Sequence, residues 1–169
     1  MLQVDVRDLR RGPVATEGKL GPGDPLFEGL DIRLAGPVQV GGTLEGAGHG
    51  GYYWHGRFAG EVRSTCRRCL EEFLTPVERA VEVIFSADPE LQEDPSVYPL
   101  TEPLAHVDLR PALREELALA VDAFPLCRED CRGLCPRCGQ DLNAGPCGCP
   151  PATALRWQGL AALKDKLRP

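Results

Sequence analysis

Eight cysteines in four close pairs constrain this chain of 169 residues more than any other feature of its sequence. In chain order the pairs are Cys66 and Cys69, Cys127 and Cys131, Cys135 and Cys138, and Cys147 and Cys149. In a reducing compartment, so many closely spaced thiols are more typical of metal ligands than of disulfides. A structural zinc takes four soft ligands in a tetrahedron. Four pairs therefore predict two sites of four cysteines each, with about two Zn²⁺ per chain.

The spacing alone leaves the partition of the four pairs open. The third and fourth pairs can close locally, because Gly145 and Pro146 provide a turn between them. The first and second pairs would then share the other metal, and we favour this partition. The alternative joins the second pair to the third and the first pair to the fourth. A single zinc with the other thiols free is also compatible with the spacing, as is iron–sulfur ligation.

The third pair is the strongest half-site because a glycine follows it. Gly139 tolerates the left-handed backbone that a Cys-x-x-Cys turn often needs, and backbone N–H groups can then point at sulfur. The first pair is followed by Leu70 instead, so it is a weaker signal by itself.

Alternating apolar and polar residues predict an antiparallel β-sheet or a small barrel up to residue 86. Residues 46–51 match the Gly-x-Gly-x-x-Gly pattern of dinucleotide sites. An aromatic strand follows this pattern where a dinucleotide site needs a helix, so it predicts a hairpin tip. Residues 10–29 are rich in Gly and Pro and are expected to be irregular. The expected strands are residues 1–9, 31–34, 37–40, 51–62 and 77–85.

The second half of the chain predicts a loop, a helix and the cysteine segment. Residues 87–107 are acidic and rich in Pro, which is typical of a loop. Asp108 is the expected N-cap of a helix that runs to about Ala123, with an apolar face that repeats every four residues. A short helix is expected at about residues 153–167.

The fold class is therefore expected to be α+β, with an N-terminal sheet or barrel, one central helix, a cysteine-rich zinc segment and a short terminal helix. The expected boundaries are a β-rich domain with the first cysteine pair over residues 1–86, the acidic loop over 87–107, and the helix with the zinc module over 108–169. The last part is expected to pack on the β domain as one unit.

Composition excludes several classes of function. The net charge of −6 argues against a general nucleic-acid coat. The sequence has no apolar run of about 18 residues, and acidic residues occupy the start where a signal peptide needs apolar ones, so we expect a cytoplasmic protein without membrane contact. No serine lies in a nucleophile elbow, so we expect no enzyme. The alternative is a metal- or thiol-dependent enzyme, such as a redox protein or nuclease, with an open metal position or an exposed cysteine of low pKa.

The block Gly-Leu-Cys-Pro-x-Cys-Gly-x-x-Leu-Asn over residues 133–143 resembles the YceD family. The preceding Cys66–Phe73 segment and the closing Cys147-Gly148-Cys149 extend this resemblance to about residues 30–167. The resemblance implies a ribosome-biogenesis factor associated with accumulation of large-subunit (23S) ribosomal RNA. It implies no catalytic residues in this chain and no small-molecule substrate. The chain departs from the family at residues 154–156, where the family often has Asp-Pro-Arg, so no role is carried over for that stretch.

Five arginines lie within the cysteine loops. Such residues could bind phosphates of immature large-subunit RNA, or they could only neutralise the thiolate sites. The acidic loop could likewise bind a basic ribosomal protein, or it could be a solvated linker. The expected partner is therefore the immature large ribosomal subunit, through its RNA or a basic protein. The five candidate residues for nucleic-acid binding are Arg67, Arg68, Arg128, Arg132 and Arg137.

Overall fold

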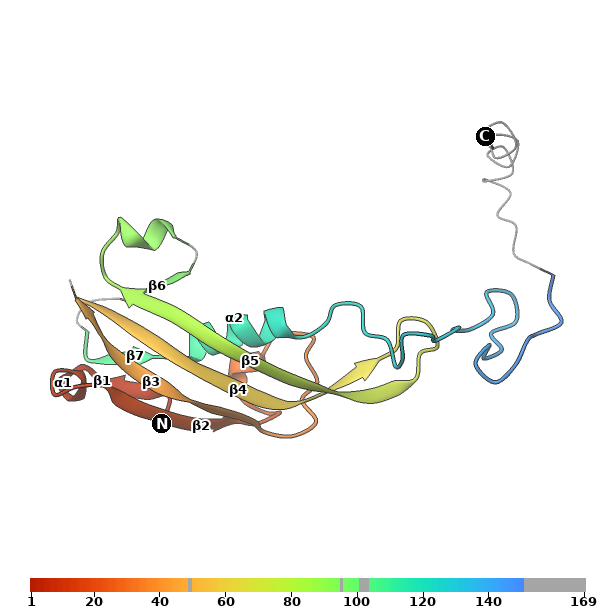
Figure 1. Ribbon diagram of the computed structural model, residues 1–169, viewed down its shortest axis with the longest axis horizontal. Helices are drawn as coiled ribbons and strands as arrows, with labels where there is room; N and C mark the ends of the chain where they lie inside the picture. Colours follow the sequence, from red (N-terminus) through yellow and green to blue (C-terminus); the bar gives the residue numbers. More distant parts are fainter. Residues whose placement is uncertain (49, 95, 101–103, 151–169) are drawn as a thin grey trace, which may run out of the picture. The chain divides into compact units, whose positions relative to one another are not determined.

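The computed structural model describes residues 1–48, 50–94, 96–100 and 104–150. The helix expected over residues 153–167 lies outside these described residues. The fold is α+β, as the sequence predicts, and the chain divides into two compact units (Figure 1). The first unit comprises Met1–Ser64 and Glu72–Pro125, and the second comprises Thr65–Glu71 and Leu126–Pro169. These boundaries differ from the expected ones, because the central helix groups with the sheet and the first cysteine pair groups with the other three.

The first unit is built on an open five-stranded sheet in the order β2-β3-β4-β5-β6. β2 and β3 pair antiparallel, as do β3 and β4, whereas β6 runs parallel to β5. Of the two architectures left open by the sequence, the sheet is the one present. The strands are β2 (Val14–Leu20), β3 (Val38–Gly48), β4 (Gly51–Thr65), β5 (Glu72–Ser86) and β6 (Val97–Pro99).

A second, two-stranded sheet joins the start of the chain to the segment before the central helix. β1 (Gln3–Asp5) pairs antiparallel with β7 (His106–Asp108). The expected strand over residues 1–9 is therefore too long, because residues Val6–Leu9 form the short helix α1. The Asp5 side chain caps this helix by accepting a hydrogen bond from the Arg7 backbone N–H, which ends the strand there.

Other strand boundaries also differ from expectation. Residues 10–29 contain β2 and a 3-10 turn, η1 (Pro25–Phe27), although they were expected to be irregular. Residues 31–34 contribute only an isolated bridge from Leu34 to Val62. β3 continues through Gly41 and Gly42, which were expected to end it. The hairpin tip between β3 and β4 is confirmed, since Gly48 pairs with Gly51.

The described residues of segment 87–107 include the 3-10 turn η2 (Leu91–Glu93), β6 and the first residues of β7, where the sequence predicted a loop. Helix α2 then runs over Arg110–Ala120, shorter than expected at its C-terminal end. The N-cap position is Leu109, one residue after the expected Asp108, and the Leu109 side chain makes no capping hydrogen bond. The Asp108 carboxylate still accepts a hydrogen bond from the Arg110 backbone N–H at the start of the helix. Among the described residues, no helix has the length and apolar character that crossing a membrane requires.

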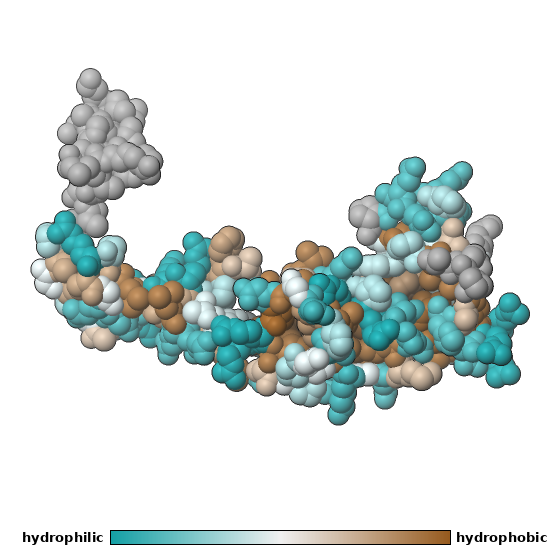
Figure 2. Space-filling model, turned by 180° about the vertical axis from the view of Figure 1, so that it is seen from behind, coloured by the Kyte–Doolittle hydropathy of each residue, from teal (hydrophilic) through white to brown (hydrophobic). Residues whose placement is uncertain are grey.

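The hydrophobic core of the first unit lies between the sheet and α2. Leu113 and Leu117 of the helix are buried in one cluster with Trp54 and Phe58 of β4. The Trp54 indole N–H donates to the Thr16 hydroxyl over 2.9 Å, so the one polar atom of this buried ring is satisfied. Figure 2, which shows the structure from behind, has hydrophilic residues (teal) over much of the surface, with hydrophobic residues (brown) visible between them.

The Trp54 ring fits over glycines of the paired strands, and this close approach predicts a large effect of adding one methyl group. A Cβ at Gly42 would lie 2.5 Å from the His55 carbonyl oxygen and 2.9 Å from the Trp54 ring. We expect Gly42→Ala to lower the free energy of unfolding by about 2 kcal/mol, because backbone must shift to relieve the overlap. Gly41→Ala is the matched control, since a Cβ there meets nothing within 4 Å. Urea denaturation of both variants checks this, and equal stabilities would contradict it.

Candidate metal centres

The second unit gathers all eight cysteines into two clusters of four. In each cluster the four sulfur atoms lie within 4.8 Å of one another, so each cluster could hold a metal ion. The grouping is the one that joins the first cysteine pair to the second and the third pair to the fourth. The first cluster consists of Cys66, Cys69, Cys127 and Cys131, and the second cluster consists of Cys135, Cys138, Cys147 and Cys149.

The sulfur spacing of the first cluster fits a tetrahedral metal. Zn–S bonds of about 2.3 Å in a tetrahedron place neighbouring sulfurs about 3.8 Å apart. The Cys66 and Cys131 sulfurs are 3.8 Å apart, and those of Cys69 and Cys127 are 3.6 Å apart. All eight cysteines are free thiols. The residues present therefore fit a metal bound by four sulfurs.

The turn after Cys135 directs backbone N–H groups inward, as the sequence predicts. The Gly139 N–H donates to the Cys135 carbonyl over 2.9 Å, and the Cys135 N–H donates to the Gln140 carbonyl over 2.8 Å. Gly139 has φ of 72°, the left-handed conformation that glycine adopts without a steric cost. The Arg137 N–H points at the Cys135 sulfur over 3.5 Å.

The turn after Cys66 has the same two backbone bonds without a glycine. The Leu70 N–H donates to the Cys66 carbonyl over 2.9 Å, and the Cys66 N–H donates to the Glu71 carbonyl over 2.8 Å. Leu70 takes a φ of 63°, and it is the one non-glycine residue in the described part of the chain with a positive φ. At the first pair, Leu70 thus occupies the left-handed position that a glycine occupies at the third pair. This conformation costs a leucine about 1–2 kcal/mol.

The thiols of the first cluster differ widely in acidity. Burial raises the pKa of the Cys66 thiol, but backbone hydrogen bonds led by the Cys127 N–H outweigh it and bring the pKa to about 6. Burial, followed by contact with the Cys69 thiol, raises the pKa of Cys127 to about 12. One sulfur of the cluster therefore ionises readily, whereas another resists ionisation beside its neighbours.

The second cluster repeats this contrast. Hydrogen bonds from the Cys138 and Arg137 backbone N–H groups lower the pKa of Cys135 to about 6. Contact with the Cys138 thiol, followed by burial, raises the pKa of Cys149 to about 12. A divalent cation between four sulfurs would remove the repulsion among the thiolates, so both clusters have the donor chemistry of a metal site.

Arg68 connects the segment of the first pair to that of the second. Its guanidinium Nη1 donates to the carbonyl oxygens of Glu129 and Cys131, over 3.2 and 2.8 Å. Its own carbonyl accepts from the Leu134 N–H over 3.0 Å. Gly133 passes so close that a Cβ there would lie 2.7 Å from the Arg68 oxygen. Arg68 therefore positions the first cluster, a role that its place in the sequence does not reveal.

Asn143 connects the loop of the second cluster to the first. Its side-chain oxygen accepts from the Arg132 backbone N–H over 2.7 Å, and its Nδ2 lies 3.5 Å from the Cys131 sulfur. The adjacent Leu142 N–H donates to the Gly133 carbonyl over 2.9 Å. In the sequence, this role is indicated only by the Leu-Asn end of the block over residues 133–143 that resembles the YceD family.

All five candidate arginines are exposed, including Arg68. The Arg128 guanidinium lies 3.5 Å from the Asp130 carboxylate, in an exposed ion pair of small energetic value. Arg67 lies in the turn of the first pair, Arg132 follows Cys131, and Arg137 lies in the turn of the third pair. The exposed arginines thus lie on turns that the clusters shape.

Comparison with protein families matches residues 54–164 to the family described as large ribosomal RNA subunit accumulation protein YceD. The chain belongs to the YceD family. The resemblance seen in the sequence is thereby confirmed, and both cysteine clusters lie within the matched residues of this YceD-family chain.

Curated relatives of the chain include uncharacterized proteins of Mycobacterium bovis and Mycobacterium tuberculosis. Each is 32% identical over 95 residues, which cover 54% of this chain and 45% of the relative. The match thus spans less than half the length of these relatives. No solved structure shows a significant match to the chain.

Proposed function

We propose that this YceD-family chain is a non-enzymatic ribosome-biogenesis factor that acts in the cytoplasm. Two zinc ions would stabilise its second unit. Its role would be the accumulation of large-subunit (23S) ribosomal RNA, through binding to immature large-subunit RNA. The observation that carries this proposal is the pair of four-sulfur clusters, which shape arginine-bearing turns in a chain of this family.

The donor set supports zinc in a structural role. Four thiolates from closely spaced cysteines are typical of structural zinc, whereas catalytic zinc keeps a position for water or substrate. When bound, zinc would supply positive charge that holds four thiolates together. The chain's own contribution is to preform the two turns, through the backbone bonds around Cys66 and Cys135.

Arginines on the cysteine-bearing turns are the proposed contacts to RNA phosphates. The Arg68 guanidinium already donates to two carbonyl oxygens, so we assign it a positioning role. Arg128 faces the Asp130 carboxylate at 3.5 Å. We therefore take Arg67, Arg132 and Arg137, which are exposed on these turns, as the proposed contacts. A turn that metal holds in one conformation loses little entropy on binding, which favours recognition.

We expect the triple variant Arg67→Gln, Arg132→Gln, Arg137→Gln to bind immature large-subunit particles about tenfold more weakly at moderate salt, because three cations no longer pair with RNA phosphates. Zinc content should stay unchanged. Co-sedimentation with immature particles on sucrose gradients, at several salt concentrations, measures this. The dependence of affinity on salt should also become shallower in the variant, by about one unit of slope for each phosphate that is no longer neutralised.

A matched control removes the same charge from the first unit. Arg7, Arg10 and Arg11 lie in or beside α1 and are exposed. Replacing these three by Gln should leave co-sedimentation nearly unchanged. If the two triple variants bind equally well, the arginine-bearing turns are not the contact with RNA.

A further inference from the structure

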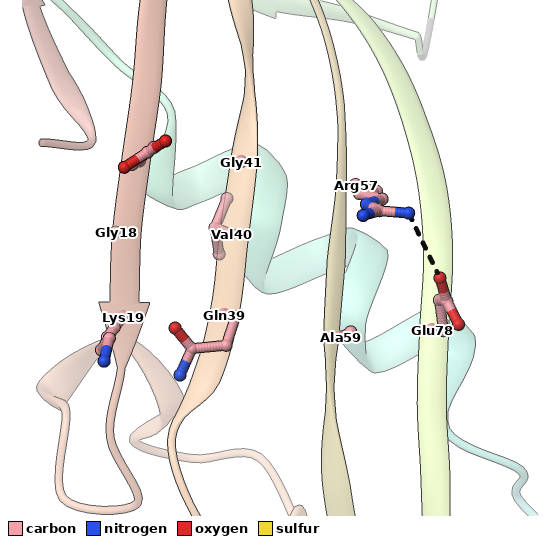
Figure 3. A pocket seen from close by; sticks show the side chains of 9 residues that line it. Gly18, Lys19, Gln39, Val40, Gly41, Arg57, Ala59 and Glu78 are labelled. Carbon is pink, nitrogen blue, oxygen red and sulfur yellow. Dashed lines mark ion pairs between the residues drawn. The ribbon is translucent and has the colours of Figure 1, made fainter.

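The five-stranded sheet has one face buried against the core and another face that we call the outer face. Along β4, Trp54 and Phe58 point into the core, whereas Tyr53, His55 and Arg57 alternate with them and point the other way. Figure 3 looks onto the outer face, with α2 behind the strands. This face therefore presents a broad surface that the core does not use.

The outer face is hollowed because its centre carries small residues. Gly41 and Ala59 lie in a hollow of about 560 Å³, with Lys19 and Glu78 among the charged residues that line it (Figure 3). A second hollow of about 320 Å³ shares Gly41 with the first and continues past Ala80. Gly41 and Arg57 line both hollows, so the two hollows adjoin on the outer face.

An aromatic ring between two carboxylates lies beside these hollows. Tyr53 pairs in register with Glu45 on β3, so their side chains are cross-strand neighbours. The Tyr53 ring also lies 5.5 Å from the His55 ring, centroid to centroid. Burial, a hydrogen bond with Glu82 and the Glu82 and Glu45 charges all raise the pKa of the Tyr53 hydroxyl. An aromatic ring flanked by carboxylates is suited to a cation, which stacks on the ring and pairs with the acids.

The charge of the outer face favours a basic partner over a nucleic acid. Carboxylates outnumber cations on the outward positions of β2 to β5. Two of the carboxylates are in ion pairs, Glu78 with Arg57 over 3.9 Å and Glu72 with Arg33 over 2.8 Å, and the other charged residues still leave the face net negative. A polyanion would meet net repulsion here, whereas a polycation would be attracted. The carboxylates are Glu17, Glu45, Glu61, Glu72, Glu78 and Glu82, and the cations are Lys19, Arg57 and Arg63.

We propose that the outer face binds an extended, arginine-rich segment of a partner protein, with one guanidinium on the Tyr53 ring between the Glu45 and Glu82 carboxylates. Small residues in the hollows leave room for the backbone of such a segment. The inference goes beyond the RNA contacts proposed above and does not depend on them, because it concerns other residues and another class of partner.

The test uses the full-length, metal-loaded chain and a fluorescent peptide of alternating arginine and glycine, about ten residues long. We expect Glu45→Gln with Glu82→Gln to weaken binding of the peptide about fivefold, because the aromatic ring is no longer flanked by two negative charges. The matched control is Glu90→Gln with Glu93→Gln, which removes equal charge from exposed positions in η2 and its cap and should change binding less than about twofold. Tyr53→Phe should bind like the parent, and Tyr53→Ala about threefold more weakly.

Amide shifts in NMR spectra identify the surface that each ligand contacts. The peptide should shift amides of β3, β4 and β5, and oligouridylate of equal length should not. Equal weakening by both double variants would show attraction by net charge alone and overturn the proposal. Shifts of these strands by oligouridylate, or concentration-dependent self-association through them, would assign the face to RNA or to a second copy instead. The peptide-binding experiment contains no ribosomal component. Its failure can therefore be distinguished from failure of the co-sedimentation experiment.

Discussion

Cys66→Ser and Cys127→Ser should each remove one and the same zinc ion, although 61 positions separate the two residues in the chain. Their sulfurs belong to the first cluster, and a tetrahedral site that lacks one thiolate loses most of its affinity. Each single variant should therefore retain about one zinc per chain, and the double variant should retain the same amount. Elemental analysis after dialysis measures this.

Cys147→Ser provides the comparison for the second cluster. Combined with Cys66→Ser, it should leave about no zinc, because the two changes affect different sites. If Cys66→Ser and Cys147→Ser instead remove the same ion, the first pair shares its metal with the fourth pair. That result would contradict the grouping of the first pair with the second. Because Asn143 lies 3.5 Å from the Cys131 sulfur, Cys147→Ser should also weaken zinc retention by the first cluster slightly.

Removal of metal should unfold the second unit and leave the first unit folded. Among the described residues of the second unit, the buried hydrophobic ones are Cys66, Cys131 and Cys135, which are themselves cluster residues. Structural zinc in small peptides contributes an apparent binding free energy of about 10–16 kcal/mol, and little else here could replace it. The first unit has its own core between the sheet and α2.

Amide hydrogen exchange with and without a strong chelator measures this difference. The N–H groups of Leu70, Leu134 and Leu142 are hydrogen-bonded in the second unit and should lose their protection. Amides of the β3–β4 ladder in the first unit should keep their protection from exchange. Added Zn²⁺ should restore the protection of the second unit. Equal loss of protection in both units would show that the first unit depends on the metal.

The parts of the fold that the sequence predicts are those with strong local patterns. The aromatic alternation of β4 and the four-residue repeat of α2 both correspond to elements in the structure. β2 is hard to predict because its sequence pattern is weak. Thr16 and Leu20 are buried, but Thr16 is polar, and Gly18 stands between them where the alternation would place an apolar side chain. Gly41 and Gly42 were expected to end β3, but the strand continues through them, and the Trp54 ring lies so close to Gly42 that no larger residue fits there.

The sequence also predicts which cysteines can act together, but not what holds them. Spacing along the chain is a local signal, and it favoured the partition that the structure displays. The contacts of Arg68 with residues 129–131, and that of Asn143 with Cys131, join segments that only the folded chain brings together. For this reason Arg68 was grouped with the RNA-binding candidates, although its guanidinium donates to backbone carbonyls.

X-ray absorption at the zinc edge, combined with metal counting on the full chain, tests the central claim most directly. The account predicts about two zinc ions per chain, each with four sulfur neighbours at about 2.3 Å. Iron in place of zinc, one metal per chain, or zinc with a nitrogen or oxygen neighbour would contradict it. A zinc bound by three sulfurs and one oxygen would favour a metal-dependent enzyme over a structural role.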